Sequence, residues 1–345
     1  MIRFILIAAL LLAGGPALSQ SAFPEPLVIA HRGASGERPE HTRAAYELAI
    51  EQGADFIEPD LVMTGDGHLV ARHENEIGGT TEVADRPEFA DRRTTKTFDG
   101  VSVTGWFTED FTLAELRTLR ARERLPQLRP ANAAFDGAEP ILTFAEVIAI
   151  AREATSRTGR PIGVIPELKH PSYFAAIGLP MEDAFVAVLE AEGWAGPDAP
   201  LVVQCFEVEP LRRLNARIDA PLVQLIAAGS GPWDRPDLTP AAMLSPEGLA
   251  EIAAYADIVG LESGLVIAHD SGTPTGVVAN AHAAGLQVHV WTLRAENYFL
   301  PPMHRRGDDP IAHGDLHAWA RALYEAGVDG VFSDFPGVAV EARKP

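Results

Sequence analysis

The feature that most constrains the fold is a regular alternation of strand-like and helix-like segments. Eight apolar, strand-like runs are predicted at residues 27–31, 55–61, 162–168, 201–206, 221–226, 257–261, 287–292 and 328–332. Segments with helical periodicity lie between or after them, at residues 42–52, 143–157, 181–192, 208–217, 246–255, 275–284 and 315–326, before a short final helix. Such alternation is typical of a parallel sheet. Eight units favour a closed (β/α)8 TIM barrel over an open doubly wound sheet, because no glycine-rich phosphate loop follows any strand.

One region departs from this rhythm. Residues 75–139 are rich in Thr, Asp, Arg and Gly, and predict only a short helix at 112–120, with Thr112 and Glu115 as a capping box. Just before it, the turn at 64–67 predicts that residues 68–72 pair with the second strand as a hairpin. The rhythm then resumes. We therefore expect a single domain over residues 22–345, with an insertion at about 75–139 between strand 2 and the helix leading to strand 3.

The N-terminus has the pattern of a secretory signal peptide. Arg3 precedes an apolar run, Phe4 to Ala13, and then small residues. This run is too short to span a membrane comfortably, although an uncleaved anchor is the alternative. We expect a signal peptide at residues 1–19, cleavage at about 19–21, and a periplasmic or secreted protein. The only cysteine, Cys205, excludes an internal disulfide.

The net charge limits the partners. The formal charge is −20, from 28 Lys and Arg against 48 Asp and Glu. A chain with this much negative charge repels nucleic acid and anionic lipid headgroups. We therefore expect no nucleic-acid partner and no stable membrane association after signal cleavage. A phosphate substrate is still possible, because a bound divalent cation and a few basic groups reverse the field locally. The oligomeric state is left open.

Polar side chains gather where the predicted strands end, which is where the loops of a barrel enzyme build the active site. These residues are His31 and Arg32, Glu58 and Asp60, His73, Glu167 and Lys169, Gln204, Trp291, and Ser333 and Asp334. Glu58 and Asp60 are two apart in one strand, so their side chains point the same way. Carboxylates buried side by side are costly unless a cation lies between them. A hard cation flanked by two histidines and an arginine suggests phosphate-ester chemistry.

Five motifs occur in order along the chain: His31-Arg32-Gly33, Pro39-Glu40-His41-Thr42, Glu58-Pro59-Asp60, His73 and Glu167-Leu168-Lys169. With them the chain resembles the glycerophosphodiester phosphodiesterase family, and most closely its exported bacterial branch. The resemblance extends to Gly330-Val331-Phe332-Ser333-Asp334-Phe335-Pro336. The insertion also lies where this family carries one.

The resemblance implies hydrolysis of glycerophosphodiesters, such as glycerophosphocholine, to glycerol 3-phosphate and an alcohol. It implies a divalent cation, with Ca²⁺ favoured and Mg²⁺ possible, and a small-molecule substrate. Carried over to this sequence, it implies metal ligands at Glu58, Asp60 and Glu167. It further implies a catalytic acid–base pair, His31 and His73, and phosphate contacts from Arg32 and Lys169.

The roles of the two histidines follow from general acid–base chemistry. One imidazole takes a proton from the glycerol 2-hydroxyl, giving a cyclic phosphate, and the other protonates the leaving alkoxide. We favour His31 as the base and His73 as the acid, but the sequence leaves the order open. Glu40, Gln204 and Trp291 are candidate substrate contacts. The alternatives are a helix-start role for Glu40 and a core position for Trp291.

Glu74 departs from the family pattern, which usually has Asp after the second histidine. The extra methylene moves any carboxylate that supports His73 by about a bond length. Two other functions stay open. A barrel phospholipase acting on intact lipid needs exposed apolar loops, and an exported phosphodiester-binding protein needs no acid–base pair.

Overall fold

The computed structural model describes residues 26–344, so the predicted signal peptide lies outside the described residues. The strands within this range are β1 (Leu27–His31), β2 (Phe56–Glu58), β3 (Asp60–Met63), β4 (Leu69–Ala71), β5 (Thr94–Phe98), β6 (Val101–Gly105), β7 (Gly163–Val164), β8 (Glu167–Leu168), β9 (Val203–Cys205), β10 (Leu222–Ile226), β11 (Ile258–Glu262), β12 (Gln287–Leu293) and β13 (Gly330–Ser333). Among them, eleven form one sheet in the order β4-β3-β8-β9-β10-β11-β12-β13-β1-β2-β7.

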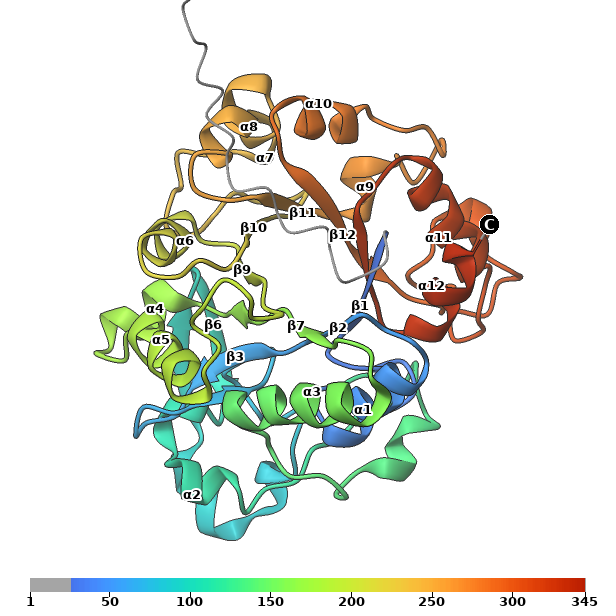
Figure 1. Cartoon of the computed structure of the whole chain (residues 1–345). Coiled ribbons are helices and arrows are strands. Elements are labelled where there is room, and N and C mark those ends of the chain that lie inside the picture. The colour runs from blue at the N-terminus through green and yellow to red at the C-terminus, as the bar shows by residue number, and fades with distance from the viewer. Residues whose placement is uncertain (1–25, 345) are drawn as a thin grey trace, which may run out of the picture.

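This sheet is parallel and strongly curled (Figure 1). Strand β1 pairs in parallel with both β13 and β2, and only β4 runs antiparallel, against β3. Pro59 separates β2 from β3, and Pro166 lies between β7 and β8, because proline has no N–H to donate to a ladder. The pairing continues across both breaks, with β2 on β7 and β3 on β8. The predicted α/β fold with a parallel sheet and the predicted hairpin partner are confirmed.

Helices lie outside the sheet, as the alternation predicted (Figure 1). Within the described residues they are α1 (Arg43–Glu51), α2 (Leu113–Leu116), α3 (Phe144–Thr158), α4 (Pro171–Ala176), α5 (Met181–Glu192), α6 (Val208–Asn215), α7 (Pro240–Met243), α8 (Pro246–Ile252), α9 (Ser263–Val266), α10 (Val277–Ala283), α11 (Leu316–Glu325) and α12 (Pro336–Arg343). Helix α3 shows the sequence signals that begin and end a helix. A capping box between Thr143 and Glu146 begins it, and Gly159, with a φ of 69°, ends it. Between residues 26 and 344, none of the helices combines the length and apolarity that crossing a bilayer requires.

The irregular region between β4 and α3 holds a separate hairpin of β5 and β6. The capping box of Thr112 and Glu115 is present, but α2 covers only four residues. The hairpin was not foreseen. Most residues of both strands are exposed or partly exposed. β5 (TTKTF) lacks the apolar alternation that marks a half-buried strand, and in β6 (VSVTG) the alternation is limited to Val101 and Val103.

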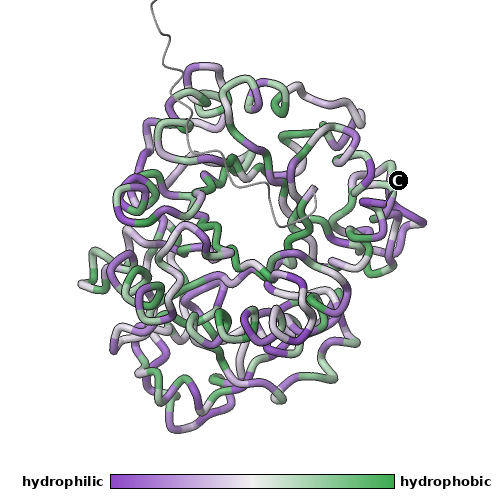
Figure 2. The backbone as a smooth tube through the Cα atoms, in the orientation of Figure 1, coloured by the Kyte–Doolittle hydropathy of each residue, from purple (hydrophilic) through white to green (hydrophobic). Residues whose placement is uncertain are grey.

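Two apolar layers hold the sheet. A large cluster of buried apolar residues contains side chains of both the strands and the helices, and a smaller, inner cluster includes Ile29, Phe56, Ile165 and Val223. Much of the backbone of the curled sheet is hydrophobic (green in Figure 2). Leu225 and Phe332 belong to this inner cluster and also line the cavity described below. The inner cluster therefore supplies part of the wall of the site.

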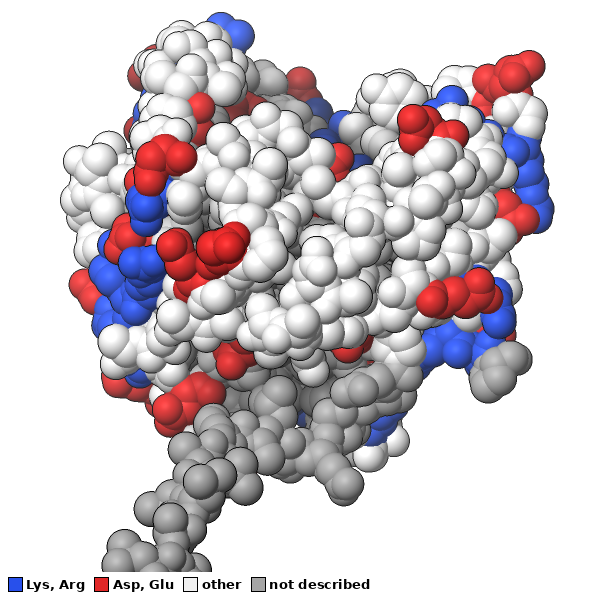
Figure 3. Space-filling model, turned by 90° about the horizontal axis from the view of Figure 1, so that it is seen from above, with Lys and Arg blue, Asp and Glu red and all other residues white. Residues whose placement is uncertain are grey.

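The acidic surplus is not spread evenly. On the face shown in Figure 3, red and blue side chains are interspersed between large areas that carry neither charge. This face is therefore not a continuous acidic surface.

Candidate active site

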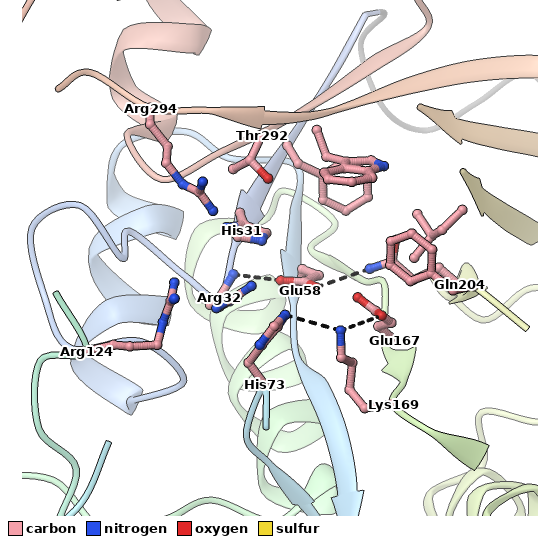
Figure 4. A pocket seen from close by; sticks show the side chains of 14 residues that line it. His31, Arg32, Glu58, His73, Arg124, Glu167, Lys169, Gln204, Thr292 and Arg294 are labelled. Carbon is pink, nitrogen blue, oxygen red and sulfur yellow. Dashed lines mark hydrogen bonds and ion pairs between the residues drawn. The ribbon is translucent and has the colours of Figure 1, made fainter. Parts of the chain in front are cut away.

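A cavity of about 220 Å³ collects most of the side chains that the sequence singled out. The predicted residues that line it are His31, Arg32, Glu58, His73, Glu167, Lys169, Gln204 and Trp291 (Figure 4). Asp60 and Glu40 are not among the lining residues, but both contact Arg32 from behind the cavity wall. The chain thus brings the predicted set together from strands far apart in sequence.

The three predicted metal ligands form a compact acidic cluster. Glu58, Asp60 and Glu167 each offer an oxygen within 4.8 Å of the others. Burial and the charge of Asp60 raise the pKa of Glu58 well above its usual range, and burial raises that of Glu167 to about 7. Burial opposes ionisation of Asp60 too, but the Arg32 guanidinium holds its pKa well below the usual range.

The cluster fits a hard cation. Oδ1 of Asp60 is buried and has no hydrogen-bond partner among residues 26–344. An unsatisfied buried oxygen beside two carboxylates that resist ionisation is the arrangement that a divalent cation would complete. Calcium and magnesium both prefer oxygen ligands of this kind.

Arg32 holds the acidic cluster together. Its Nε lies 3.0 Å from Oδ2 of Asp60, and its Nη1 donates to Glu40 at 3.0 Å. Its backbone N–H donates to Oε2 of Glu58 at 2.7 Å. This last contact needs a left-handed φ of 59° at Arg32.

The following residue, Gly33, also has a positive φ, 84°, and a Cβ there would lie 2.6 Å from the backbone of Ala45. Only glycine fits. In the His-Arg-Gly motif, the first two residues therefore supply side chains to the cavity, and the glycine allows the backbone to make this turn.

Lys169 provides the second cation of the cavity. Its Nζ donates to Glu167 at 2.8 Å and lies 3.1 Å from Nε2 of His73 (Figure 4). The ammonium group therefore bridges the acidic cluster and one of the two candidate catalytic imidazoles.

His31 is oriented by a buried carboxylate. Its Nδ1 lies 2.6 Å from Oδ1 of Asp334, which also accepts hydrogen bonds from Arg129 and Arg294 at Oδ2. Burial and the nearby Arg32 lower the pKa of His31 to about 3. A neutral imidazole that donates from Nδ1 to Asp334 leaves Nε2 free to accept a proton in the cavity.

His73 has a matching arrangement. Its Nδ1 lies 2.5 Å from Oε1 of Glu74. The other carboxylate oxygen of Glu74 is 4.0 Å from Nε2 of His170, whose Nδ1 contacts Asp99 at 2.6 Å. Burial, Arg32 and Lys169 lower the pKa of His73 to about 4. Asp99 and Glu74 outweigh the burial of His170 and raise its pKa to about 9.

The side chain of Glu74 is thus placed between two imidazoles. Asp99 lies in the turn between β5 and β6, so this chain of contacts connects the hairpin with the cavity. Glu74 has a longer side chain than the Asp that is usual in the family, and it still contacts His73.

The remaining predicted residues occupy distinct positions. Gln204 donates from Nε2 to Glu58 at 3.1 Å and so supports a candidate metal ligand. Trp291 donates to the carbonyl of Gly260, and its ring meets Phe206 edge-on at 5.7 Å, forming an apolar wall. Glu40 is shared between Arg32 and Arg124.

Several residues of the site were not assigned a role from the sequence. Arg124, Thr292 and Arg294 line the cavity, and Asp334, Arg129, His170 and Asp99 support the two imidazoles. Asp334 and Arg294 lie at or near strand ends, which is a usable signal. Arg124, Arg129 and Asp99 lie in the irregular region, where no periodic pattern marks them.

Comparison with known proteins agrees with this geometry. The model of the Glycerophosphoryl diester phosphodiesterase family matches residues 31–338. A glycerophosphodiester phosphodiesterase of Arabidopsis thaliana is 38% identical, over 90% of this chain and 84% of the relative. One of Haemophilus influenzae is 29% identical, over 93% of this chain and 90% of the relative.

The fold also matches solved structures. A phosphodiesterase of Oleispira antarctica, solved in complex with the product sn-glycerol-3-phosphate, aligns with a TM-score of 0.60 and 23% identity, covering 92% of this chain and 96% of that one. The family match covers most of the chain, including every predicted site residue. The chain therefore belongs to the glycerophosphoryl diester phosphodiesterase family.

Proposed function

We propose that this protein hydrolyses glycerophosphodiesters to glycerol 3-phosphate and an alcohol, with a divalent cation at the acidic cluster. One observation carries the proposal. Two imidazoles, each with a carboxylate on its Nδ1, line a cavity whose wall also carries the buried side chains of Arg32 and Lys169 and lies against a cluster of three carboxylates. Family membership and the product held by the Oleispira relative give independent support.

The proposed phosphate site combines the cation with basic side chains. Glu58, Asp60 and Glu167 would hold the metal, which when bound supplies Lewis-acid stabilisation of charge on the phosphoryl oxygens. Arg32 and Lys169 add fixed positive charge. Their donors are already held in place by carboxylates, so little reorganisation is needed as the charge shifts in the transition state.

His31 serves as the base in the first step. Its Nε2 takes the proton from the glycerol 2-hydroxyl, and that oxygen attacks phosphorus. The bond from phosphorus to the alcohol oxygen breaks, and His73 gives its proton to the departing alkoxide. The products of this step are the free alcohol and a cyclic glycerol phosphate.

Water completes the reaction with the roles reversed. His73 removes a proton from water, the water oxygen attacks phosphorus, and His31 returns its proton to the 2-oxygen as the ring opens. Burial, Arg32 and Lys169 lower the pKa of His73 in the free cavity, and a bound phosphodiester anion opposes the effect of the two cations. Substrate binding therefore prepares His73 to act as an acid.

The identity of the metal, one substrate, the domain organisation and the location of the protein are proposed from the sequence. We propose Ca²⁺ as the metal and glycerophosphocholine as one substrate. We further propose a single domain over residues 22–345, a closed (β/α)8 barrel with an insertion at about 75–139. The signal-like pattern of residues 1–19 supports membership of the exported bacterial branch and a periplasmic or secreted location.

The test is glycerol 3-phosphate release from glycerophosphocholine by residues 22–345 after treatment with a chelator. We expect release to return with added Ca²⁺ or Mg²⁺. His31→Ala and His73→Ala should each lose activity by more than about 100-fold. His68→Ala is the matched control, because His68 is exposed in the turn before β4. If the folded protein binds the diester but releases nothing with either ion, it is a binding protein and the proposal fails.

A further inference from the structure

A second cavity, of about 440 Å³, adjoins the candidate active site. Arg124 and Arg294 line both cavities, so the two spaces meet at this pair. Leu125, Gln127 and Leu128 form one wall of the second cavity, and Tyr298 and Phe299, which follow β12, form the other. The catalytic steps proposed above give the second cavity no role, and the two arginines enter only through their Nε contacts with Glu40 and Asp334.

Both arginines have N–H groups that make no hydrogen bond within the described part of the chain. Arg124 donates from Nε to Glu40 at 2.8 Å, and Arg294 from Nε to Asp334 at 3.0 Å. The terminal nitrogens of both guanidinium groups make no hydrogen bond to any residue between 26 and 344. In Figure 4 both groups lie on the side of the cavity away from Glu167 and Lys169. They are therefore separate from Lys169, whereas Arg32 lies between the two groups of cations and shares Oε2 of Glu40 with Arg124.

The carboxylates nearby do not neutralise this pair completely. Glu40 is shared with Arg32, and Asp334 is shared with His31 and Arg129. Burial and the neighbouring guanidinium groups of Arg32, Arg129 and Arg124 lower the pKa of Arg294, although Asp334 acts in the opposite direction. Several cations close together, with free N–H groups directed into a cavity, favour an anion between them.

The wall of the second cavity that Tyr298 and Phe299 form can pack against the uncharged part of a ligand whose anionic group the arginines bind. The guanidinium of Arg294 stacks 4.5 Å from the centre of the Phe299 ring, and this stacking fixes its plane. Tyr298 meets Phe299 edge-on, and 63% of Tyr298 is exposed. Aromatic faces with a polar tip can pack against the ring of a polyol while the hydroxyl donates or accepts.

We propose that the second cavity is the subsite for the alcohol half of the substrate, and that it selects alcohols carrying a second phosphate, such as an inositol phosphate. This inference rests on the proposed function and names its substrate class. Arg124 and Arg294 donate hydrogen bonds to the second phosphate, while Arg32 and Lys169 contact the scissile phosphate. A cationic alcohol such as choline gains nothing from the pair, because like charges repel.

The experiment compares glycerophosphoinositol with glycerophosphoinositol 4-phosphate, which differ only in the second phosphate. We measure kcat/KM for glycerol 3-phosphate release. The wild type should prefer the phosphorylated substrate by about tenfold or more, the effect of one or two charge-assisted hydrogen bonds. Arg124→Gln and Arg294→Gln should each bring the ratio of the two kcat/KM values toward one. Arg122→Gln is the matched control, because Arg122 is partly exposed and pairs with Asp85 outside both cavities.

Two kinetic results overturn the subsite. Either the wild-type ratio is near one, or both Gln variants lower kcat/KM equally for the two substrates, which assigns the pair to the scissile phosphate. Calorimetric titration with inositol 4-phosphate, the alcohol product, tests the subsite without turnover. If neither diester is hydrolysed but this binding persists and weakens about tenfold in Arg124→Gln, the proposed function fails while the subsite stands. Absence of binding overturns the subsite.

Discussion

Nδ1 of His31 lies 2.6 Å from Oδ1 of Asp334, although 303 residues separate the two along the chain. The pairing of the first and last strands, β1 and β13, brings them together, with Ala30 in register with Ser333. The same carboxylate receives Arg129 and Arg294. The imidazole orientation on which the proposed first step depends is therefore fixed by the meeting of the two ends of the fold.

Replacing Asp334 by Asn tests that dependence. The amide keeps the shape but no longer stabilises an imidazolium or selects the Nδ1–H tautomer of His31. We expect kcat to fall by about 100-fold or more, with KM changed much less. Steady-state kinetics on protein whose fold is verified by circular dichroism measures this. A kcat within about threefold of wild type rules out an orienting role for Asp334.

Glu74 gives a graded prediction for the second imidazole. Glu74→Gln removes the negative charge beside His73, so kcat should fall by about 10- to 100-fold. Glu74→Asp keeps the charge but is too short to lie against both His73 and His170, so its loss should be smaller. The measurement is kcat for the two variants side by side. Equal losses show that the charge is not what matters at this position.

Metal binding should depend on pH in a defined direction. The pKa of Glu167 is raised to about 7 in the metal-free protein, so below pH 7 a cation must displace a proton from it. We expect Ca²⁺ affinity to fall by about tenfold or more for each pH unit between pH 7 and pH 6, because the cation also displaces a proton from Glu58, whose pKa is raised well above its usual range. Calorimetry in two buffers of different ionisation enthalpy also counts the protons released. An affinity that is constant from pH 6 to pH 8 contradicts the assignment of Glu167 as a ligand.

The same pKa predicts a cost in stability. The folded-state pKa of Glu167 lies above its ordinary value of 4.5, so ionising this side chain between pH 4.5 and 7 disfavours the folded state. Without metal, Glu167→Gln should therefore gain stability relative to wild type as the pH rises from 5 to 8, by up to about 3 kcal/mol. Urea denaturation at both pH values measures the difference. A free-energy difference that does not change with pH means that Glu167 titrates normally.

The fold and the strand-end residues were accessible from sequence because both follow periodic rules. Strand–helix alternation predicts a parallel sheet, and the carboxyl ends of parallel strands lie at one edge, which places His31, Glu58 and Glu167 together. Asp334 was visible at a strand end, but its contact with His31 required knowing that β13 pairs with β1.

The rest of the site depends on segments without periodic pattern. Arg124 reaches the cavity from irregular backbone, and Arg129, also on irregular backbone, contacts Asp334. Asp99 contacts His170 from an exposed hairpin. Their side chains are placed by tertiary contacts with Glu40, Asp334 and His170, which no local propensity specifies.

The most direct measurement of the proposed chemistry is the rate of His31→Ala and His73→Ala on two substrates that differ in leaving group. Glycerophosphocholine releases a poor leaving group that needs a proton, whereas the p-nitrophenyl ester of glycerol 3-phosphate releases a stable phenolate that does not. With His73 as the acid, His73→Ala should lose more than about 100-fold on glycerophosphocholine. Its loss should be less than about tenfold in the first-turnover release of p-nitrophenolate, which precedes the ring opening in which His73 is the base. With His31 as the base, His31→Ala should lose more than about 100-fold on both. If both variants hydrolyse glycerophosphocholine within about threefold of the wild-type rate, acid–base catalysis by this pair is wrong.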